Sequence, residues 1–507
     1  MKENTNGAIA LNTTILYIRL AIVSVCGLAY TRFGLQALGV TDYGMFSVVA
    51  CIITFATVIN TVMVSTSNRF IATAIGRGDE AETNRQFNVN LLIHILIAVG
   101  TAVIALPAGH WYIDRYVNYD GNMADVRMVY DVSMAGWILS FVGVPYNGLL
   151  LARERFLVFC STDVLSSVVK LVVTYLLIDH FSHKLLIYAL STAFMTGFPT
   201  FVFIYYCHRK FPEITRPRLV RGWKRYREVL GFSVGIAIGA LASIVKNQGG
   251  ALIVNAFFSA AMNAGLAIAN SVCNILLTFA NNAQKSISPQ IVKNYAKGDL
   301  ERSSVLVCLA SRVTYLSMLT VAVPFLLVPE KILDIWLAET PPYSITFIRL
   351  FIVDLLILSI NAGINDFIFA SGRIKLYQII VNGFLVLSVI TGYAVMKAGD
   401  APEYLFYVYI FFSLVIFFIR PLLLKRVAKF DIRLLVVRSY IPVFGVTLLF
   451  LPVFLVKAQA EAWMGAWGFL AAAYVYFIAL VWFLGLGSNE RAFLSEKTKS
   501  LWRKAKG

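Results

Sequence analysis

Long apolar stretches alternate with short polar ones over nearly the whole chain. About fourteen of these stretches approach the roughly 20 residues that a helix needs to cross the hydrocarbon core of a bilayer. The alternating ten-residue pattern of a membrane barrel is not seen, and a helix satisfies its own backbone hydrogen bonds in lipid. The pattern therefore predicts an all-α polytopic membrane protein. The predicted spans are 11–31, 44–66, 87–106, 129–150, 157–178, 185–206, 229–254, 260–280, 305–328, 345–370, 376–396, 404–419, 439–456 and 463–486.

The longest polar interval between the two ends of the chain is the basic run Cys207–Arg227, which carries eight Lys or Arg and one Glu. Hydrophobic spans lie on both sides of it. We therefore expect a basic connector between two blocks of helices, with two further helices at the end. The predicted domains are an N-terminal six-helix lobe at 1–206, a cytoplasmic connector at 207–228, a C-terminal six-helix lobe at 229–424, and two additional helices with a basic tail at 425–507.

The second block of spans repeats the first at a shift of 220 residues. The loop Arg77-Gly78-Asp79 matches Lys297-Gly298-Asp299, and Ala152–Arg155 matches Gly372–Lys375. Two six-helix halves in parallel orientation would produce this match, and internal repeats are typical of transporters. The alternative is that loop chemistry recurs only because all inner loops are basic.

The net charge of +17 would also suit a nucleic-acid-binding protein, but its placement along the chain argues against this. With the amino terminus inside, thirty-two Lys and Arg fall in inner segments and seven in outer loops, as the positive-inside rule requires. The 59% hydrophobic and 14% charged residues lie outside the range of soluble domains. We expect a multi-pass protein of the inner (plasma) membrane, with both termini cytoplasmic. The six cysteines lie within or at the ends of spans, so no disulfide framework is expected.

Several short motifs resemble the polysaccharide-transporter branch of the multidrug/oligosaccharidyl-lipid/polysaccharide exporter superfamily, which includes the O-antigen and capsule-type flippases. They are Arg19 in the first span, the turn from Arg32 to Gly44, the Gly-Asp loop after the second span, and the hairpin Ala152–Phe156. The resemblance implies two six-helix lobes around a central cavity. It also implies alternating access, with a lipid-pyrophosphate-linked glycan carried from the inner to the outer leaflet.

Ionisable side chains inside spans are costly and tend to face a cavity or a partner. Five cations lie inside predicted spans, and the acids inside spans are fewer, chiefly Asp163 and Asp354. A cavity that these residues shared would therefore be net cationic. Such a cavity suits a pyrophosphate or an acidic sugar, because Lys and Arg supply charge and hydrogen-bond donors to phosphate oxygens. The substrate-binding candidates are Arg19, Lys170, Lys246, Arg312 and Arg349.

Structural roles are the alternatives for these cations. Arg19 and Lys246 lie deep in their spans, where a salt bridge could hold them. The other two arginines lie close enough to span ends for their side chains to reach the headgroups. Lys170 follows Asp163 by seven residues, and the two share a helical face on which they could pair.

Small and amide side chains form stripes on three spans. The small residues of span 229–254 share a face with Lys246, which permits close helix packing or leaves room beside a pore. The amide stripes lie on spans 260–280 and 345–370. Their side chains either bind sugar hydroxyls or join neighbouring helices. The small residues are Gly235, Gly239, Ser243 and Gly250, and a further amide is Asn281. The sugar-contact candidates are Asn263, Asn270, Asn274, Asn361 and Asn365.

Embedded acids and histidines can carry a coupling ion. The candidates are Asp163, Asp354 and His94, with a packing role as the alternative for His94. The chain has no Walker motif, so ATP is not expected to drive it directly. It also has no His-Glu-x-x-His or Cys-x-x-Cys motif, so neither an enzyme nor a metal site is expected. The only expected cofactor is a coupling ion, H⁺ or Na⁺.

We therefore expect a bacterial secondary transporter that flips a polyprenyl-pyrophosphate-linked oligosaccharide for O-antigen, capsule or exopolysaccharide assembly. Its expected partners are this substrate, membrane lipids and other polysaccharide-assembly membrane proteins, and no nucleic acid. One alternative is a multidrug or cation antiporter of the same superfamily, which the excess of embedded cations disfavours. A glycan polymerase or ligase should carry catalytic residues in large outer loops, and a membrane scaffold has no need for so many embedded charges.

Overall fold

A computed structural model describes residues 2–76, 78–119, 121–153, 155–399, 401–428, 430–487 and 490–491 of the chain. Within these ranges the regular secondary structure is entirely helical. Two compact units are present. The first comprises residues 1–268, 336–344 and 396–398, and the second comprises 269–335, 345–395 and 399–507.

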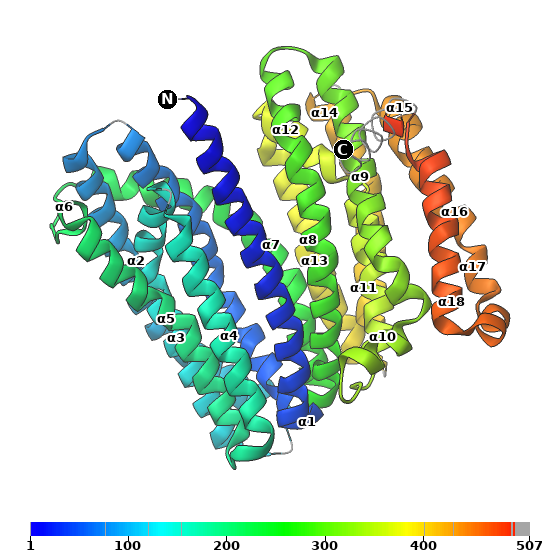
Figure 1. The fold of residues 1–507 in the computed structure, drawn as a ribbon, viewed down its shortest axis with the longest axis horizontal. Helices are drawn as coiled ribbons and strands as arrows, with labels where there is room; N and C mark the ends of the chain where they lie inside the picture. The colour runs from blue at the N-terminus through cyan, green and yellow to red at the C-terminus, as the bar shows by residue number, and fades with distance from the viewer. Residues whose placement is uncertain are drawn as a thin grey trace, which may run out of the picture. The chain divides into compact units, whose positions relative to one another are not determined.

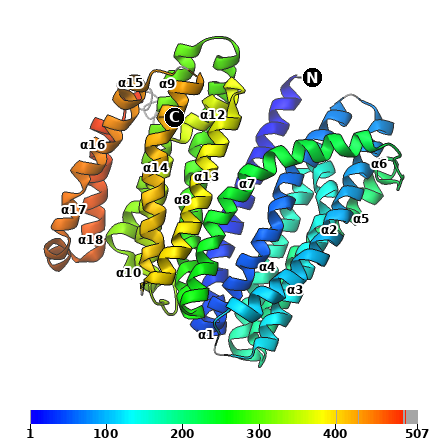
Figure 2. The ribbon, with the colours of Figure 1, turned by 180° about the vertical axis from the view of Figure 1, so that it is seen from behind.

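Unit 1 contains most of the long helices of the first half of the chain (Figures 1 and 2). The helices α2 to α5 run side by side, with α3 packed between α2 and α5. The short α6 follows at the end of α5. The bounds are α1 Lys2–Gly76, α2 Glu80–Tyr116, α3 Met123–Ala152, α4 Phe156–His180, α5 Lys184–Lys210, α6 Pro212–Thr215 and α7 Trp223–Phe257.

Unit 2 is built around α9, against which α12 and the C-terminal helices pack. The helix α8 begins in unit 1 and continues in unit 2. The bounds are α8 Ala260–Ala296, α9 Leu300–Leu327, α10 Pro329–Trp336, α11 Ser344–Ser359, α12 Ala362–Ser371, α13 Ile374–Ala398, α14 Glu403–Ala428, α15 Ile432–Leu435, α16 Ile441–Phe450, α17 Pro452–Leu455 and α18 Lys457–Leu480, with π-helical turns η1 Val436–Tyr440 and η2 Val481–Gly485.

Twelve helical ranges in the described part of the chain are long and apolar enough to cross a membrane. The first, Ile18–Thr54, contains Gly39 at φ 76° and ψ 174°, where two helical segments meet. A positive φ is strained for residues with a side chain, so glycine suits this turn. The predicted span 229–254 lies in α7, where the side chains of residues 234–244 are outside what the structure describes. The prediction of an all-α multi-pass membrane protein is confirmed.

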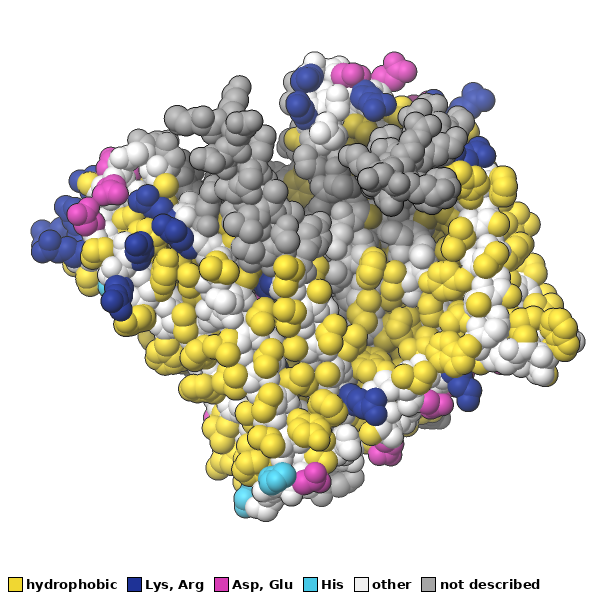
Figure 3. Space-filling model, in the orientation of Figure 1, with side chains coloured by type: hydrophobic (Ala, Val, Ile, Leu, Met, Phe, Trp, Pro, Cys, Tyr) yellow, Lys and Arg dark blue, Asp and Glu magenta, His cyan; other side chains and the backbone are white. Residues whose placement is uncertain are grey.

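Exposed apolar side chains cover the outer surface of the long helices. On α2, Leu96, Val103 and Ile104 expose 61%, 67% and 72% of their surface. In water such exposure would be unfavourable, but a lipid-facing helix loses nothing by it. Figure 3 shows apolar side chains along the length of the helices, with most of the charged side chains gathered at the helix ends.

The core of unit 1 lies between α1, α3 and α5. Tyr130 and Met134 of α3 are fully buried in one apolar cluster with Val48 of α1. A Cβ atom at Gly136 of α3 would stand 2.5 Å from the carbonyl oxygen of Ala193 on α5. The absence of a side chain therefore allows the two helices to touch through their backbones, as small residues do in membrane helix packing.

The two loops that matched at a shift of 220 residues have the same local structure. Gly78 and Gly298 both adopt positive φ, at 71° and 82°. Each is followed by an Asp that caps the next helix: Asp79 accepts from the Glu82 amide at 2.8 Å, and Asp299 from the Arg302 amide at 2.9 Å. The second matched pair agrees less closely, since α4 begins at residue 156 and α13 at residue 374. The lobe boundaries drawn from the repeat stay a prediction.

Candidate functional site

Arg19 and Asp163 form an ion pair between α1 and α4. Nη2 and Nε of Arg19 lie 2.5 and 2.6 Å from Oδ2 of Asp163. The guanidinium also lies over the ring of Phe159, 5.0 Å from its centroid. About a third of each side chain remains exposed, at 28% for Arg19 and 33% for Asp163. The structural salt bridge that the sequence left open for Arg19 is therefore present, and it removes one charge of each sign from the membrane interior.

Lys170 of α4 is held by an aromatic face. Its Nζ lies 3.8 Å from the ring centroid of Tyr30, which stacks on Tyr188 at 5.0 Å. The Tyr30 hydroxyl is hydrogen-bonded to Thr192 at 2.9 Å, which fixes the ring. The alternative pairing of Lys170 with Asp163 is not formed, because the carboxylate turns to Arg19. Among the described residues, no carboxylate lies within ion-pair distance of Lys170.

Lys246 is buried in α7, with 6% of its surface exposed. Gly250, one turn further along the helix, is also buried. The surroundings of Gly235, Gly239 and Ser243, the other members of the predicted stripe, lie outside what the structure describes. The stripe itself therefore stays a prediction, while the burial of its lysine is observed.

His94 of α2 lies in a buried polar cluster between α1 and α2. Its Nδ1 is 2.6 Å from the carbonyl oxygen of Asn90, and Asn90 accepts a hydrogen bond from Ser67 at 2.9 Å. Because a carbonyl oxygen can only accept, Nδ1 carries the hydrogen and Nε2 presents a lone pair. Nε2 has no hydrogen-bond partner in the described part of the chain, although only 1% of His94 is exposed. His94 thus has a free site for a proton.

Three predicted sugar-contact residues join helices instead of standing free. Asn263 is fully buried, and in its satisfied amide orientation it donates to Ala251 at 2.9 Å and accepts from the amide of Asn255 at 3.0 Å. Asn361 donates to the Phe417 carbonyl at 3.1 Å and accepts from the Tyr440 hydroxyl. Asn365 likewise accepts from the Tyr377 hydroxyl at 2.5 Å. Asn270 is half-buried, and Asn274 and Asn281 are exposed.

The charged candidates of unit 2 all have polar partners. Arg312, 8% exposed, pairs with Glu490 and donates to the Arg438 carbonyl at 3.0 Å. Arg349 lies 3.2 Å from Glu330. Asp354, 4% exposed, accepts from the hydroxyl of Ser413. Unit 2 therefore neutralises both of its embedded arginines with acids that lie outside the spans predicted to contain those arginines.

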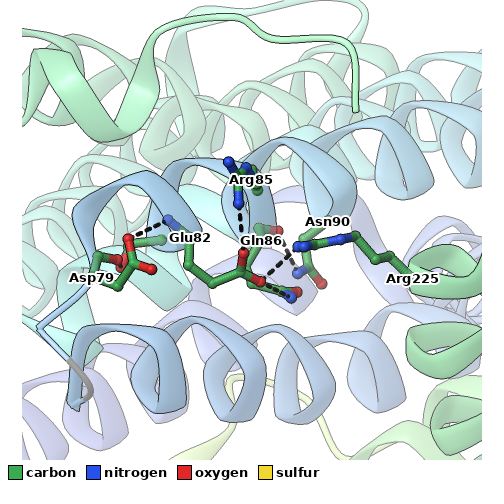
Figure 4. A network of polar contacts seen from close by, with 7 residues as sticks. Asp79, Glu82, Arg85, Gln86, Asn90 and Arg225 are labelled. Atoms are coloured by element: carbon green, nitrogen blue, oxygen red, sulfur yellow. Dashed lines mark hydrogen bonds and ion pairs between the residues drawn. The ribbon is translucent and has the colours of Figure 1, made fainter. Parts of the chain in front are cut away.

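A polar network that the sequence analysis missed joins the start of α2 to the start of α7 (Figure 4). The Glu82 carboxylate accepts hydrogen bonds from the side chains of Arg225 at 2.6 Å, Gln86 at 3.0 Å and Arg85 at 3.4 Å. The i,i+3 and i,i+4 spacings of the last two were visible in the sequence. Arg225 lies 143 residues from Glu82, so only the fold could reveal that contact.

The same region holds the backbone of the connector. Asn84 and Asn88, one helical turn apart on α2, hydrogen-bond the chain between Glu213 and Arg218. The i,i+4 spacing of two asparagines is the signal that could have found this contact. It would not have named the segment that they hold.

No family model and no curated protein sequence matches the chain. Solved structures do share its fold. An inward-facing multidrug resistance MATE-family transporter of the MOP superfamily has a TM-score of 0.63 at 15% identity, covering 82% of this chain and 99% of its own. The lipid II flippase MurJ, in an inward closed conformation, also has a TM-score of 0.63, at 10% identity, covering 93% of this chain and 99% of its own. A MOP superfamily transporter from Pyrococcus furiosus has a TM-score of 0.58 at 15% identity, covering 83% of this chain and 96% of its own. The chain therefore has the fold of MOP superfamily transporters.

Proposed function

We propose that this protein is a secondary transporter that flips a polyprenyl-pyrophosphate-linked oligosaccharide across the inner membrane by alternating access. The fold supports transport, because the structures that share it include multidrug transporters and a lipid II flippase. Identities of 10–16% leave the substrate open. The choice between an anionic glycan lipid and a cationic drug therefore depends on the charges inside the spans.

Lys170 carries the proposal for an anionic substrate. Arg19 is matched by Asp163, whereas Lys170 rests on the ring of Tyr30 with no carboxylate nearby among the described residues. A cation–π contact holds an ammonium without neutralising it. Lys170 is therefore a positive charge in a span that can still attract a phosphate oxygen.

The test is flipping of a labelled polyprenyl-pyrophosphate glycan in proteoliposomes. Lys170→Met should lower the rate at least tenfold, because a single charge-assisted hydrogen bond is worth roughly 1.5–3 kcal/mol. Arg349→Gln is the matched control, since Arg349 is already paired with Glu330 near a helix end. Unchanged flipping by Lys170→Met would remove this residue from the substrate path.

A multidrug or cation antiporter is the second candidate, and the MATE-family structures support its fold equally. Asp163 and Asp354 are the embedded acids that could attract a cationic drug. Extrusion of a cationic dye by the same proteoliposomes, without movement of the glycan lipid, would favour this candidate.

For the coupling ion we propose a proton, with His94 as the group that carries it. Asp163 is held by Arg19 and Asp354 by Ser413. His94 alone of the three predicted coupling residues presents a buried acceptor without a hydrogen-bond partner in the described part of the chain. A proton on Nε2 would create a buried charge, which a transport step could expel.

A further inference from the structure

The connector between α5 and α7 is a rigid part of unit 1. Asn84 donates to the carbonyls of Glu213, Ile214 and Arg216 at 3.1, 2.8 and 2.9 Å. Asn88 donates to the carbonyl of Arg216 at 3.0 Å and accepts from the amide of Arg218 at 3.0 Å. These five hydrogen bonds fix the path of the chain over residues 213–218.

One apolar side chain anchors the same segment. Ile214 is 2% exposed and packs in a cluster with Phe87 of α2 and Phe203 of α5. The backbone of this segment is thus held by the side-chain amides of Asn84 and Asn88 and by the burial of Ile214. A segment fixed in this way loses little conformational entropy when its outward side chains bind a ligand.

Most of the exposed charged side chains of the connector are basic. Arg216, Arg218 and Arg221 are exposed, and no described carboxylate forms an ion pair with any of them. They differ in this from Arg225, which is engaged by Glu82. Further exposed cations extend the surface on both sides. These are Arg209, Lys210, Lys224 and Arg227.

Large apolar side chains stand among these cations. Leu219 exposes 75% of its surface and Trp223 exposes 69%. On α5, just before the connector, Phe201 and Tyr205 are exposed by 53% and 65%. Figure 3 shows Lys and Arg gathered at this edge of unit 1, beside α6, directly above the apolar side chains of the long helices. The basic surface therefore meets the lipid-facing surface at the level expected for headgroups.

A hollow of about 500 Å³ lies within this surface, lined among others by Asn84, Arg216 and Arg218. Glu80 and Glu213 also line it. Among the described residues, neither carboxylate forms a hydrogen bond with any of the three unpaired arginines. These cations therefore remain available to an anion.

We propose that the connector surface, residues 209–227, is a binding site for the phosphate headgroups of anionic phospholipids in the leaflet on its side of the membrane. The three unpaired arginines bind the phosphates, and Leu219 and Trp223 enter the acyl boundary. Lipid is the occupant that fits, because a soluble polyanion would have no use for exposed Leu and Trp beside a lipid-facing helix. This site is independent of the transported substrate.

The experiment measures lipid binding to the full-length purified protein by native mass spectrometry, with phosphatidylglycerol against zwitterionic phosphatidylcholine. Each Lys or Arg near an anionic surface contributes about fivefold in affinity. The triple change Arg216→Gln, Arg218→Gln and Arg221→Gln should therefore weaken phosphatidylglycerol binding roughly a hundredfold. It should leave phosphatidylcholine binding unchanged.

The matched control neutralises three exposed cations at the ends of helices in unit 2: Lys425→Gln, Arg426→Gln and Arg433→Gln. Phosphatidylglycerol binding at the connector should keep its affinity in this control, because none of the three substituted cations belongs to residues 209–227. An equal loss in both triple variants overturns the proposal, because the effect would then be general to the net charge. Binding of polyprenyl pyrophosphate without binding of phosphatidylglycerol also overturns it, since the surface would then belong to the substrate.

A second measurement tests the apolar part of the surface. The difference in fluorescence between the unsubstituted protein and Trp223→Phe gives the contribution of the Trp223 indole. This difference is measured in nanodiscs with brominated and with unbrominated phosphatidylglycerol. This contribution should be quenched by bromine on the acyl chain. A Trp223 contribution that brominated lipid leaves unchanged overturns the insertion of this side chain.

Discussion

Arg19 and Asp163 face each other across α1 and α4 at 2.5 Å, and the guanidinium rests on the ring of Phe159. The pair converts two charges that are costly in a membrane into one neutral unit. It also ties the first helix of the chain to the fourth, 144 residues later.

Removal of one partner should destabilise the protein. Asp163→Asn leaves the Arg19 cation without its anion. Because about a third of each side chain is exposed, we expect a loss of roughly 1–3 kcal/mol, below the ~3–5 kcal/mol of a fully buried pair. Thermal unfolding in detergent measures this loss. Asp131→Asn, at an exposed pair with His110, is the control and should be near neutral. Equal melting temperatures for both variants would contradict a stabilising role.

His94→Asn should uncouple transport from a proton gradient. Asparagine can form hydrogen bonds at this position but cannot take up a proton. The rate of transport in proteoliposomes should then no longer respond to an imposed pH gradient. His110→Asn is the control, because His110 is half-exposed and already bonded to Asp131 at 2.7 Å. A His94→Asn variant that responds to the gradient as the unsubstituted protein does would rule out His94 as the proton carrier.

Gly136→Ala should weaken the contact of α3 with α5. The added Cβ would lie 2.5 Å from the Ala193 carbonyl oxygen, so the helices must separate. We expect a cost of about 1–3 kcal/mol, as for other overpacked sites. Gly100→Ala, on α2, is the matched control: its Cβ meets no atom within 4 Å, and alanine favours a helix by up to ~1 kcal/mol. The two substitutions should therefore shift the melting temperature in opposite directions, as measured by scanning fluorimetry. A shift in the same direction would count against the packing argument.

The double change Asn84→Ala and Asn88→Ala should expose the connector to trypsin. Arg218 and Arg221 are exposed, but the backbone beside them is held by the two asparagines. Cleavage requires local opening of the connector. The loss of five hydrogen bonds lowers the free energy that this opening costs. Limited proteolysis of the detergent-solubilised protein should proceed several-fold faster. Asn294→Ala, which removes a bond within its own helix, is the control. If both variants are cut at the original rate, the asparagines do not limit the opening of the connector.

The sequence was sufficient for the class of fold, because a membrane helix is recorded in the local run of apolar residues. It also indicated a turn between Arg32 and Gly44, where the structure has a turn at Gly39, and it matched the loops at Gly78 and Gly298, which have the same local structure. These features depend on residues within a few positions of one another. The sugar, the coupling ion and the lobe boundaries stay predictions.

The roles of individual charged and amide side chains were harder to predict. Asp163 shares a helical face with Lys170, yet it pairs with Arg19, because α1 brings a guanidinium closer. Asn263 has the spacing of a stripe that could line a cavity, yet it bonds the backbone of α7. A helical face specifies a direction, and several helices can lie in that direction.

The sequence by itself determined that the chain crosses a membrane many times as helices and that it carries a basic connector between two blocks of them, because hydrophobicity and charge act locally. Only the tertiary structure decided which charges are neutralised and which remain. Arg312 finds Glu490 from 178 residues away, Arg225 finds Glu82, and Lys170 finds a tyrosine ring. The physical reason is that an ion pair depends on distance in space, which helix packing sets and sequence separation does not.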